Sequence, residues 1–365
     1  MKVISVFNNK GGVGKTTLTF HLAHALAGMG KKVLMIDADP QCNLTIYSLD
    51  QDFIHDLWEE ENQFIDEGFE TSKDKLSNTE FDSLNNKTRS LHYLLMPTEE
   101  GTGELDVMPP PKELTSNLDI IPGRLTLHKY EEKISARWSD MYRGEPLAIR
   151  TITKIRQLAE AYSEQSHYDY VIVDTSPSLG AMNKVIISMV DGFFVPASPD
   201  LFSVYGIRNI GKSIAGWRKE FDTIYQLISD EKRKLFPVNF VMFMGYTIYN
   251  AKKYDGMNDW KLAQGHFNYA QQIPQTISSF IPKNVREPIT SEQIQLPIGG
   301  LSVMHTHNTF PSMAQKYHTP MWDVPNKDLE PEDKSTITAN AAKYRSTKEA
   351  YCNFTNDLIS RIDLL

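Results

Sequence analysis

The chain alternates between short apolar runs and longer stretches whose apolar residues recur at helical spacing. The clearest run is residues 170–174, where β-branched side chains fill the centre, as in a parallel strand buried on both faces. The predicted strands are residues 2–7, 32–36, 118–121, 170–174, 192–196, 238–247 and 276–281. The predicted helices include residues 16–29, 149–163, 206–220 and 335–365.

This alternation of strand and helix continues to the end of the chain. It is typical of parallel sheets, because each parallel connection has to cross over the sheet and usually does so as a helix. We therefore expect an α/β fold with a doubly wound, mostly parallel sheet flanked by helices. We expect one domain over residues 1–365.

Two segments break the alternation. Residues 51–115 form an acidic insertion after the second strand, and its apolar residues predict an amphipathic helix docked on the body. Those apolar residues are Ile54, Leu57, Trp58, Phe64, Ile65 and Phe69. Residues 287–330 are irregular and rich in Pro and His, and with the final helix they make a C-terminal region at about 287–365.

Composition narrows the class of protein. The chain has 365 residues, 41% of them hydrophobic, which is enough for a full core. No stretch approaches the roughly 20 apolar residues that span a membrane, and the apolar start is too short for a signal peptide, so we expect a cytoplasmic protein. Cys42 and Cys352 lack metal-ligand spacing, and His305 and His307 lack a paired third ligand.

The formal charge of −8 seems to argue against nucleic acid as a partner, but its distribution removes that objection. Residues 51–89 hold eleven acids and four bases, a net of −7, which leaves −1 for the rest of the chain. The body of the protein is therefore almost neutral.

The loop Lys10-Gly11-Gly12-Val13-Gly14-Lys15-Thr16-Thr17 lies between the first predicted strand and the first predicted helix, which is the context of a P-loop. Its glycines let backbone N–H groups turn toward phosphates, Lys15 neutralises β/γ charge, and Thr16 offers a hydroxyl to Mg²⁺. The positive end of the helix dipole adds to this anion site. We therefore predict ATP and Mg²⁺ as cofactors.

Acids stand at two predicted strand ends, where open α/β sheets place their sites. Asp37 and Asp39 are two residues apart, so both carboxylates can point to the magnesium side, one holding metal-bound water and the other positioning the attacking water. Asp174 closes the most apolar strand, where an acid is rarely structural.

The ordinary P-loop would have Gly at position 9, where this chain has Asn9, and a second lysine, Lys10, is not needed for simple binding. The segment 10–17 resembles the deviant Walker A signature of the ParA/MinD family of partition and positioning ATPases. This resemblance implies that Lys10 reaches across a two-fold homodimer to the partner's nucleotide. It covers about residues 1–50 and 115–290.

Further segments resemble the family. Asp37-Ala38-Asp39-Pro40-Gln41 is similar to its D-x-D-P-Q switch, which implies Asp39 as the catalytic acid. Asp174 matches the Walker B acid that contacts Mg²⁺ through water. Pro282 and Asn284 resemble residues of the family's adenine pocket. Cys42 stands where the family usually has Gly, and Ser176 replaces a usual Pro in the second switch.

A ParA-like dimer binds DNA without sequence preference, so we looked for a basic face. In the predicted helix 206–220, Arg208, Lys212 and Lys219 share one face, opposite to an apolar face, and Arg218 extends it. The run 232–234 and the pair 252–253 extend it further. A solvated amphipathic helix without DNA is an equal alternative.

The sequence thus predicts an ATPase in which ATP assembles a DNA-binding dimer and slow hydrolysis, stimulated by a ParB-like activator, releases it. Partition of plasmid or chromosome, or cargo positioning, would follow, with association to the nucleoid if DNA is bound. Alternatives are a regulatory ATPase coupled to an operon partner or effector, and a MinD-like membrane cycle. The final helix has mixed charge on its polar face and is expected to pack on the body instead of on lipid.

Overall fold

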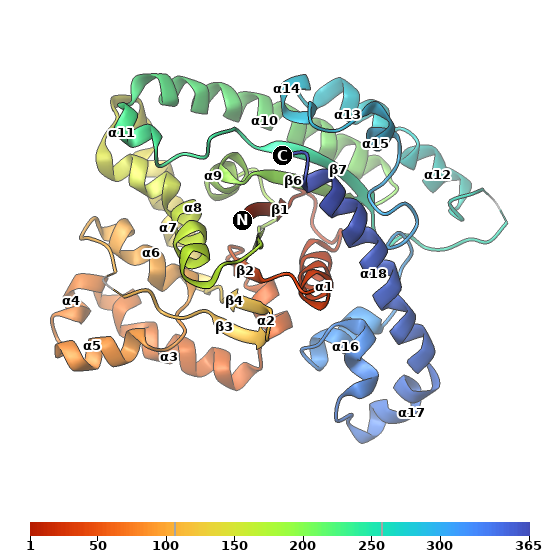
Figure 1. The fold of residues 1–365 in the computed structure, drawn as a ribbon, viewed down its shortest axis with the longest axis horizontal. Coiled ribbons are helices and arrows are strands. Elements are labelled where there is room, and N and C mark those ends of the chain that lie inside the picture. Colours follow the sequence, from red (N-terminus) through yellow and green to blue (C-terminus); the bar gives the residue numbers. More distant parts are fainter. Residues whose placement is uncertain (106, 257) are drawn as a thin grey trace.

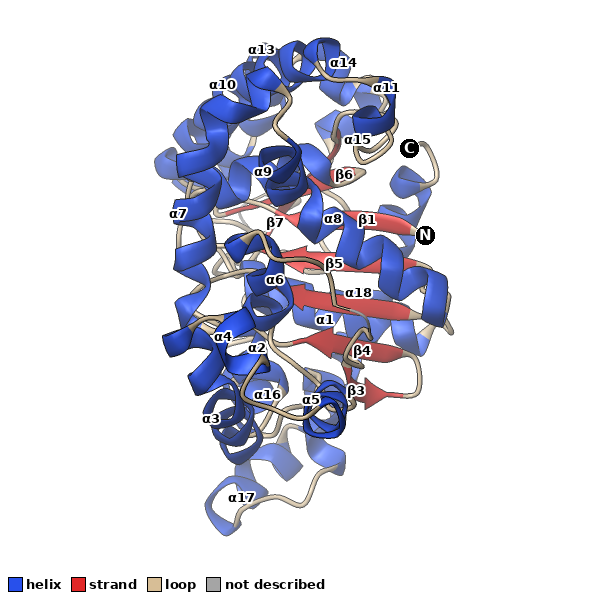
Figure 2. Ribbon diagram, turned by 90° about the vertical axis from the view of Figure 1, so that its left-hand side faces the viewer, coloured by secondary structure: helices blue, strands red, loops and turns tan. Residues whose placement is uncertain are grey.

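A seven-stranded sheet forms the centre of the protein (Figures 1 and 2). The computed structural model describes residues 1–105, 107–256 and 258–365. The strand order is β3-β4-β2-β5-β1-β6-β7, and all neighbours are parallel except the pair of β3 and β4. The strands are β1 Lys2–Val6, β2 Val33–Asp37, β3 Lys112–Thr115, β4 Leu118–Ile121, β5 Tyr170–Asp174, β6 Gly192–Ala197 and β7 Met242–Ile248. The predicted doubly wound α/β fold is confirmed.

Helices cover both faces of this sheet. In order along the chain they are α1 Lys15–Gly28, α2 Asn43–Ser48, α3 Gln51–Glu67, α4 Phe69–Lys73, α5 Asn78–Asn85, α6 Leu91–Glu100, α7 His128–Arg137, α8 Pro146–Ser166, α9 Ala181–Met189, α10 Leu201–Leu227, α11 Asp230–Arg233, α12 Gln264–Ala270, α13 Ile273–Phe280, α14 Lys283–Arg286, α15 Ser291–Gln295, α16 Phe310–Lys316, α17 Pro331–Ala339 and α18 Ala341–Ile362. Short 3₁₀ turns are η1 Leu125–Leu127, η2 Trp138–Arg143 and η3 Met321–Asn326.

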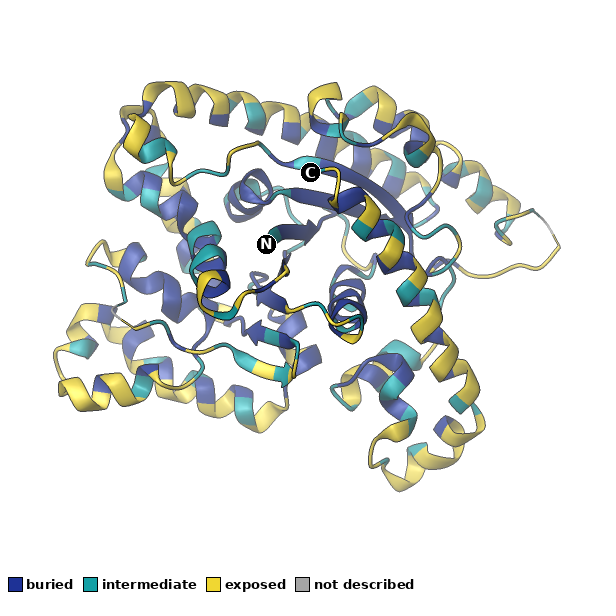
Figure 3. Ribbon diagram, viewed as in Figure 1, coloured by how far each residue is buried: buried dark blue, intermediate teal, exposed yellow. Residues whose placement is uncertain are grey.

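The two faces of the sheet bury separate hydrophobic clusters. In β2, Leu34 and Ile36 belong to the cluster that includes α8, α9 and α10, whereas Val33 and Met35 belong to the cluster that includes α1 and α18. This division follows from the pleat, because successive side chains point to opposite faces. Figure 3 shows the central strands buried beneath the helices, whose outer faces are exposed, whereas the edge strand β3 has no fully buried residue.

The predicted strand at residues 276–281 is wrong, because this segment lies in and just after helix α13. Ile273 and Ile277 are buried and four residues apart, so both lie on the helix face that packs on α10. A Cβ at Gly211 of α10 would lie only 2.4 Å from the carbonyl oxygen of Phe280, which shows how closely the backbones approach. The sheet therefore ends at β7.

The insertion is larger than one amphipathic helix. It contains α3 to α6 and strand β3, and α3 buries the apolar face that the sequence predicted. Its own aromatic cluster consists of Phe64, Phe69, Phe81 and Tyr93, with ring centroids 5.2 to 6.5 Å apart. The predicted docking of this segment is confirmed.

The predicted final helix is two helices, α17 and α18, which meet at Asn340. Tyr351, Phe354 and Leu358 of α18 are buried in the cluster that includes α1, so this helix packs on the body as expected. Among the described residues, no helix is both long and apolar enough to cross a bilayer.

Candidate nucleotide-binding site

The loop between β1 and α1 has the backbone of an anion cradle. Gly12 and Gly14 have φ angles of 73° and 79°, in the left-handed region that favours glycine. A Cβ at Gly14 would also lie 2.4 Å from Cε1 of Tyr249, so no larger residue fits there. Gly14 is the N-cap of α1, and the first N–H groups of this 14-residue helix are therefore available to a phosphate.

Lys15 and Thr16 follow at the start of this helix. Lys15 is buried with 7% exposure, and desolvation lowers the pKa of its ammonium, although the nearby Asp174 and Asp39 partly oppose this. The Thr16 hydroxyl donates a 2.9 Å hydrogen bond to Asp174 Oδ2. The structure thus brings the predicted phosphate lysine and the predicted magnesium threonine to the predicted Walker B acid.

The three predicted acids converge on the same place. Asp37 and Asp174 are paired in register at the ends of β2 and β5, and both are fully buried; Asp39 is 3% exposed. Burial raises the pKa of Asp174 to about 7, with a further contribution from the charge of Asp37. Burial likewise raises the pKa of Asp37 to about 6. Three buried carboxylates thus share one buried ammonium.

This donor set fits Mg²⁺ only together with a nucleotide. Within the described residues, no three His, Cys, Asp or Glu side chains gather as a metal site of their own. Mg²⁺, however, usually keeps several waters and takes one or two carboxylates plus substrate phosphates. The Thr16 hydroxyl and the Asp174 carboxylate lie beside the phosphate-binding loop, and the nearby acids outnumber the one buried lysine. These groups match that requirement.

Asp37 is held by two residues that the sequence analysis missed. Its Oδ2 accepts hydrogen bonds from the backbone N–H of Thr45 at 2.8 Å and from the Thr45 hydroxyl at 2.6 Å. The same hydroxyl accepts a bond from the N–H of Gly123 at 2.7 Å. A Cβ at Gly123 would lie 3.0 Å from the Asp37 carboxylate, so only glycine fits comfortably. The Pro122-Gly123 turn at a strand end was the available signal.

Cys42 adopts a φ of 54°, which explains why glycine is usual at this switch position in the family. A left-handed backbone costs a non-glycine residue roughly 1–2 kcal/mol. The turn nevertheless forms, because the N–H of Cys42 bonds to the carbonyl of Asp39 at 2.8 Å. In the second switch, the side-chain amide of Asn183 donates to the carbonyls of Ser176 and Ser178, and so orders the turn without the usual proline.

Lys10 lies at the mouth of the loop and is tied within its own chain. Its Nζ is 2.5 Å from Asp200 Oδ2 and 5.8 Å from the centroid of the Phe202 ring. Asp200 also caps α10, since its Oδ1 accepts the N–H of Ser203. No sequence pattern pointed to Asp200 or Phe202, because their proximity to Lys10 comes from the neighbouring positions of β1 and β6.

Pro282 and Asn284 are not brought to the phosphate loop. They line a hollow of about 310 Å³ on α10, together with Arg218 and Lys219. Their contact with adenine stays a prediction.

The four predicted DNA contacts all lie on α10, but they differ in exposure and in their contacts within the chain. Lys212 and Lys219 are exposed, and neither forms an ion pair in the described part of the chain. Arg208 lies 5.0 Å from the ring centroid of Phe280, and Arg218 is 3.6 Å from the Asp222 carboxylate. The bases at 232–234 are each engaged locally, with a carbonyl or a nearby acid.

Known proteins resemble this chain in sequence. A family model described as an AAA domain matches residues 1–227, more than half of the chain. The chromosome partitioning protein ParA of Caulobacter vibrioides is 26% identical over 215 residues, which are 59% of this chain and 62% of that protein. Among the curated relatives, the aligned stretch spans between 41% and 68% of their own length.

Two solved structures share the fold. pNOB8 ParA bound to nonspecific DNA has a TM-score of 0.53 and 17% identity, with coverage of 99% of this chain and 98% of that one. The ATP complex of Cyanothece McdA(D38A) has a TM-score of 0.54 and 15% identity, with coverage of 98% and 96%. The chain therefore belongs to this AAA-domain family, and within it to the ParA/MinD group of P-loop ATPases with a deviant Walker A loop.

Proposed function

We propose that this ATPase is a Mg²⁺-ATP-dependent dimerisation switch of the ParA type that holds DNA without sequence preference. The observation that carries the proposal is the position of Lys10. Its ammonium lies at the mouth of the phosphate loop, is 28% exposed, and has one intrachain carboxylate partner, Asp200. It is therefore available to a second subunit's nucleotide once that contact is released.

An exposed apolar surface beside Lys10 supports the dimer. Leu201, Phe202 and Tyr205 lie in the first turns of α10 and are 44%, 72% and 54% exposed. Large apolar side chains in such a group favour a protein interface. Phe202 also contacts Lys10, so the surface that a second copy would bury adjoins the lysine that would cross to it.

The roles of the site residues follow from their placement. The loop N–H groups and Lys15 bind the phosphates, and bound Mg²⁺ would neutralise the charge that develops on them. Thr16 and Asp174 would hold the ion, and Asp37 holds the switch helix α2 through Thr45. Asp39 orients water for hydrolysis. Because Lys10 is supplied by the other subunit, hydrolysis is slow until the dimer and a ParB-like activator assemble.

The proposed ligand of the ATP-bound dimer is DNA. A protein of the same fold, pNOB8 ParA, has been solved on nonspecific DNA. In this chain, Lys212 and Lys219 offer two exposed, unpaired cations on α10, whereas Arg218 is engaged by Asp222. A role in plasmid or chromosome partition, or in cargo positioning on the nucleoid, follows from such binding.

Filter or anisotropy binding to two unrelated duplexes tests this function. The ATP-bound protein should hold both with similar affinity, should lose them in ADP, and should weaken steeply as salt rises. Lys212→Ala with Lys219→Ala should lower affinity roughly tenfold and reduce the salt slope by about 2. Lys343→Ala, an exposed lysine of α18, is the matched control. Binding that is absent, sequence-specific or insensitive to salt rejects the DNA function.

A regulatory ATPase coupled to a dedicated partner is the second candidate, and the insertion favours it. Every acid of residues 51–89 except Glu61 is exposed, so the insertion presents a negative outer surface. It also contacts the switch, because Trp58 Nε1 donates to the carbonyl of Gly123, whose N–H bonds to Thr45. A MinD-like membrane cycle is disfavoured, since α18 buries its apolar face in the core.

A further inference from the structure

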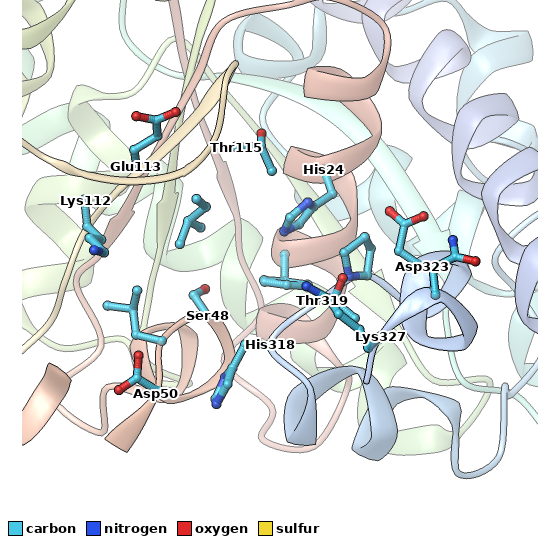
Figure 4. Close-up of a pocket in the computed structure, with 15 residues that line it drawn as sticks. His24, Ser48, Asp50, Lys112, Glu113, Thr115, His318, Thr319, Asp323 and Lys327 are labelled. Carbon is cyan, nitrogen blue, oxygen red and sulfur yellow. The ribbon is translucent and has the colours of Figure 1, made fainter. Parts of the chain in front are cut away.

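A cleft of about 500 Å³ lies outside the nucleotide site (Figure 4). Its walls are the outer part of α1, the end of α2, strand β3 and the segment 318–327. None of its lining residues belongs to the phosphate loop or to the three strand-end acids. Figure 4 shows His24 on the helix side, Lys112 and Glu113 on the strand side, and His318 and Thr319 opposite. Its volume is in the range of small-ligand sites.

Two polar atoms on this wall have no hydrogen-bond partner among the described residues. Ser48 is 5% exposed and its Oγ is unpaired, as is Nε2 of His24. Burial, with a smaller contribution from Lys327, lowers the pKa of His24 to about 3, so its imidazole is neutral near pH 7. Buried polar groups are nearly always paired with protein or ordered water, so these two atoms leave hydrogen-bonding capacity unused in the wall of the cleft.

Charged side chains of both signs line the cleft. Asp50, Lys112 and Glu113 lie on one side of it and Asp323 and Lys327 on the other (Figure 4), and none of the five forms an ion pair in the described part of the chain. A ligand that carries only one sign of charge would be repelled by part of this lining. A ligand with an ammonium and a carboxylate would satisfy both parts.

The cleft borders the sheet edge, because all four residues of β3 line it. A second hollow of about 250 Å³ shares His24, Thr115 and Asp323 with it, and continues past the end of β3. β3 is the terminal strand of the sheet, so one of its backbone edges has no neighbouring strand. Extended peptides use such edges. We propose that the cleft binds a short peptide with free ends, lying along β3, as an effector of the ATPase.

The effector role rests on the proposed function, and the position of the cleft supports it. α1 begins at the phosphate loop, and α2 begins directly after the switch residue Cys42 and ends at Ser48 in the cleft wall. Tyr47 of α2 also bonds to the C-terminal region, through its hydroxyl to the carbonyl of Pro311. A peptide between these elements would restrain α2 and therefore slow hydrolysis.

Thermal shift and calorimetry with L-peptides of two to four residues test the binding directly in the absence of nucleotide. Free-ended peptides should stabilise the protein, and N-acetylated, C-amidated versions of the same peptides should not. Ser48→Ala should weaken binding severalfold, and Lys112→Met with Asp323→Asn at least tenfold. Lys343→Met, outside the cleft, should bind as the parent protein does. ATP turnover should fall at least twofold when the free peptide is bound.

Absence of binding across the panel, equal binding of capped peptides, or unchanged binding by the cleft variants would overturn the site. Binding with unchanged turnover would overturn the effector role. A protein that binds the peptides but never hydrolyses ATP would refute the proposed function and leave the site standing, so the two failures are distinguishable.

Discussion

The nucleotide site and the insertion both bury charged side chains, but they treat them differently. In the site, three buried carboxylates face a single buried lysine. In the insertion, the buried Glu61 accepts bonds from the N–H and hydroxyl of Ser90 and lies 3.4 Å from Arg124. A buried charge without enough opposite charge destabilises the fold, so we interpret it as a site where a bound ligand supplies the missing charge. A buried charge that is paired within the protein is interpreted as a structural contact. The contrast separates a binding region from a structural one.

Removal of the lysine from the site should have the largest effect. Lys15→Ala deletes the positive charge nearest the phosphates and leaves the three acids unopposed. We expect nucleotide affinity to fall at least 100-fold in a fluorescent-ATP titration, while the fold is kept. Retained affinity would show that the loop does not bind phosphate as described.

A substitution that breaks the buried pair of the insertion should have the opposite effect. It should lower the stability of the fold and leave the nucleotide affinity of the folded protein unchanged. Arg124→Met removes the cation beside buried Glu61, and also its bonds to the Trp58 carbonyl and the Asn62 side chain. Breaking a buried pair costs about 3–5 kcal/mol. Urea denaturation measures this loss, and the double variant with Glu61→Leu should recover part of it. An unchanged denaturation midpoint for Arg124→Met would refute the structural role.

The pH dependence of stability should sharpen the contrast. The pKa values of Asp37 and Asp174 in the folded protein are about 6 and about 7, above the ordinary value of 3.8. Between these pH values the folded, nucleotide-free protein therefore binds more protons than the unfolded chain does. Their contribution to stability is complete below pH 3.8 and is lost as pH rises through 6 and 7.

The Tm of the nucleotide-free protein, followed from pH 5 to 8, should therefore carry a decline of several degrees from these two groups. Asp37→Asn should flatten it, and Asp222→Asn, an exposed acid of α10, should not. Mg²⁺-ATP should also flatten it, because the cation that Asp174 would hold lowers the pKa of a nearby carboxyl. A slope unaffected by Asp37→Asn would refute the assignment.

The smallest effect is expected at Asp200. Its contact with Lys10 is partly exposed, and such pairs contribute about 0–1 kcal/mol. Asp200→Asn keeps an N-cap residue for α10 but weakens the hold on Lys10, so ATP-dependent dimer affinity should rise modestly, about two- to fivefold. Sedimentation at several concentrations measures it. A weaker dimer would mean that Asp200 supports the interface.

Local patterns predicted which residues lie together around the phosphate loop. The strand, glycine loop and helix around Lys15, and the acids at strand ends, follow from features that lie within a few residues of each other. The contacts of Lys10 with Asp200 and of Asp37 with Thr45 and Gly123 could not be predicted, because they depend on which strands become neighbours. The prediction of a strand at residues 276–281 was wrong, because a short apolar run is compatible with both a strand and the buried face of a helix.

The role of Lys10 is the central claim, and light scattering coupled to size exclusion tests it most directly. The parent protein and Lys343→Ala should be monomers without nucleotide and dimers with Mg²⁺-ATP. Lys10→Ala should bind ATP with nearly unchanged affinity and remain a monomer. A Lys10→Ala protein that still dimerises with ATP would contradict the account.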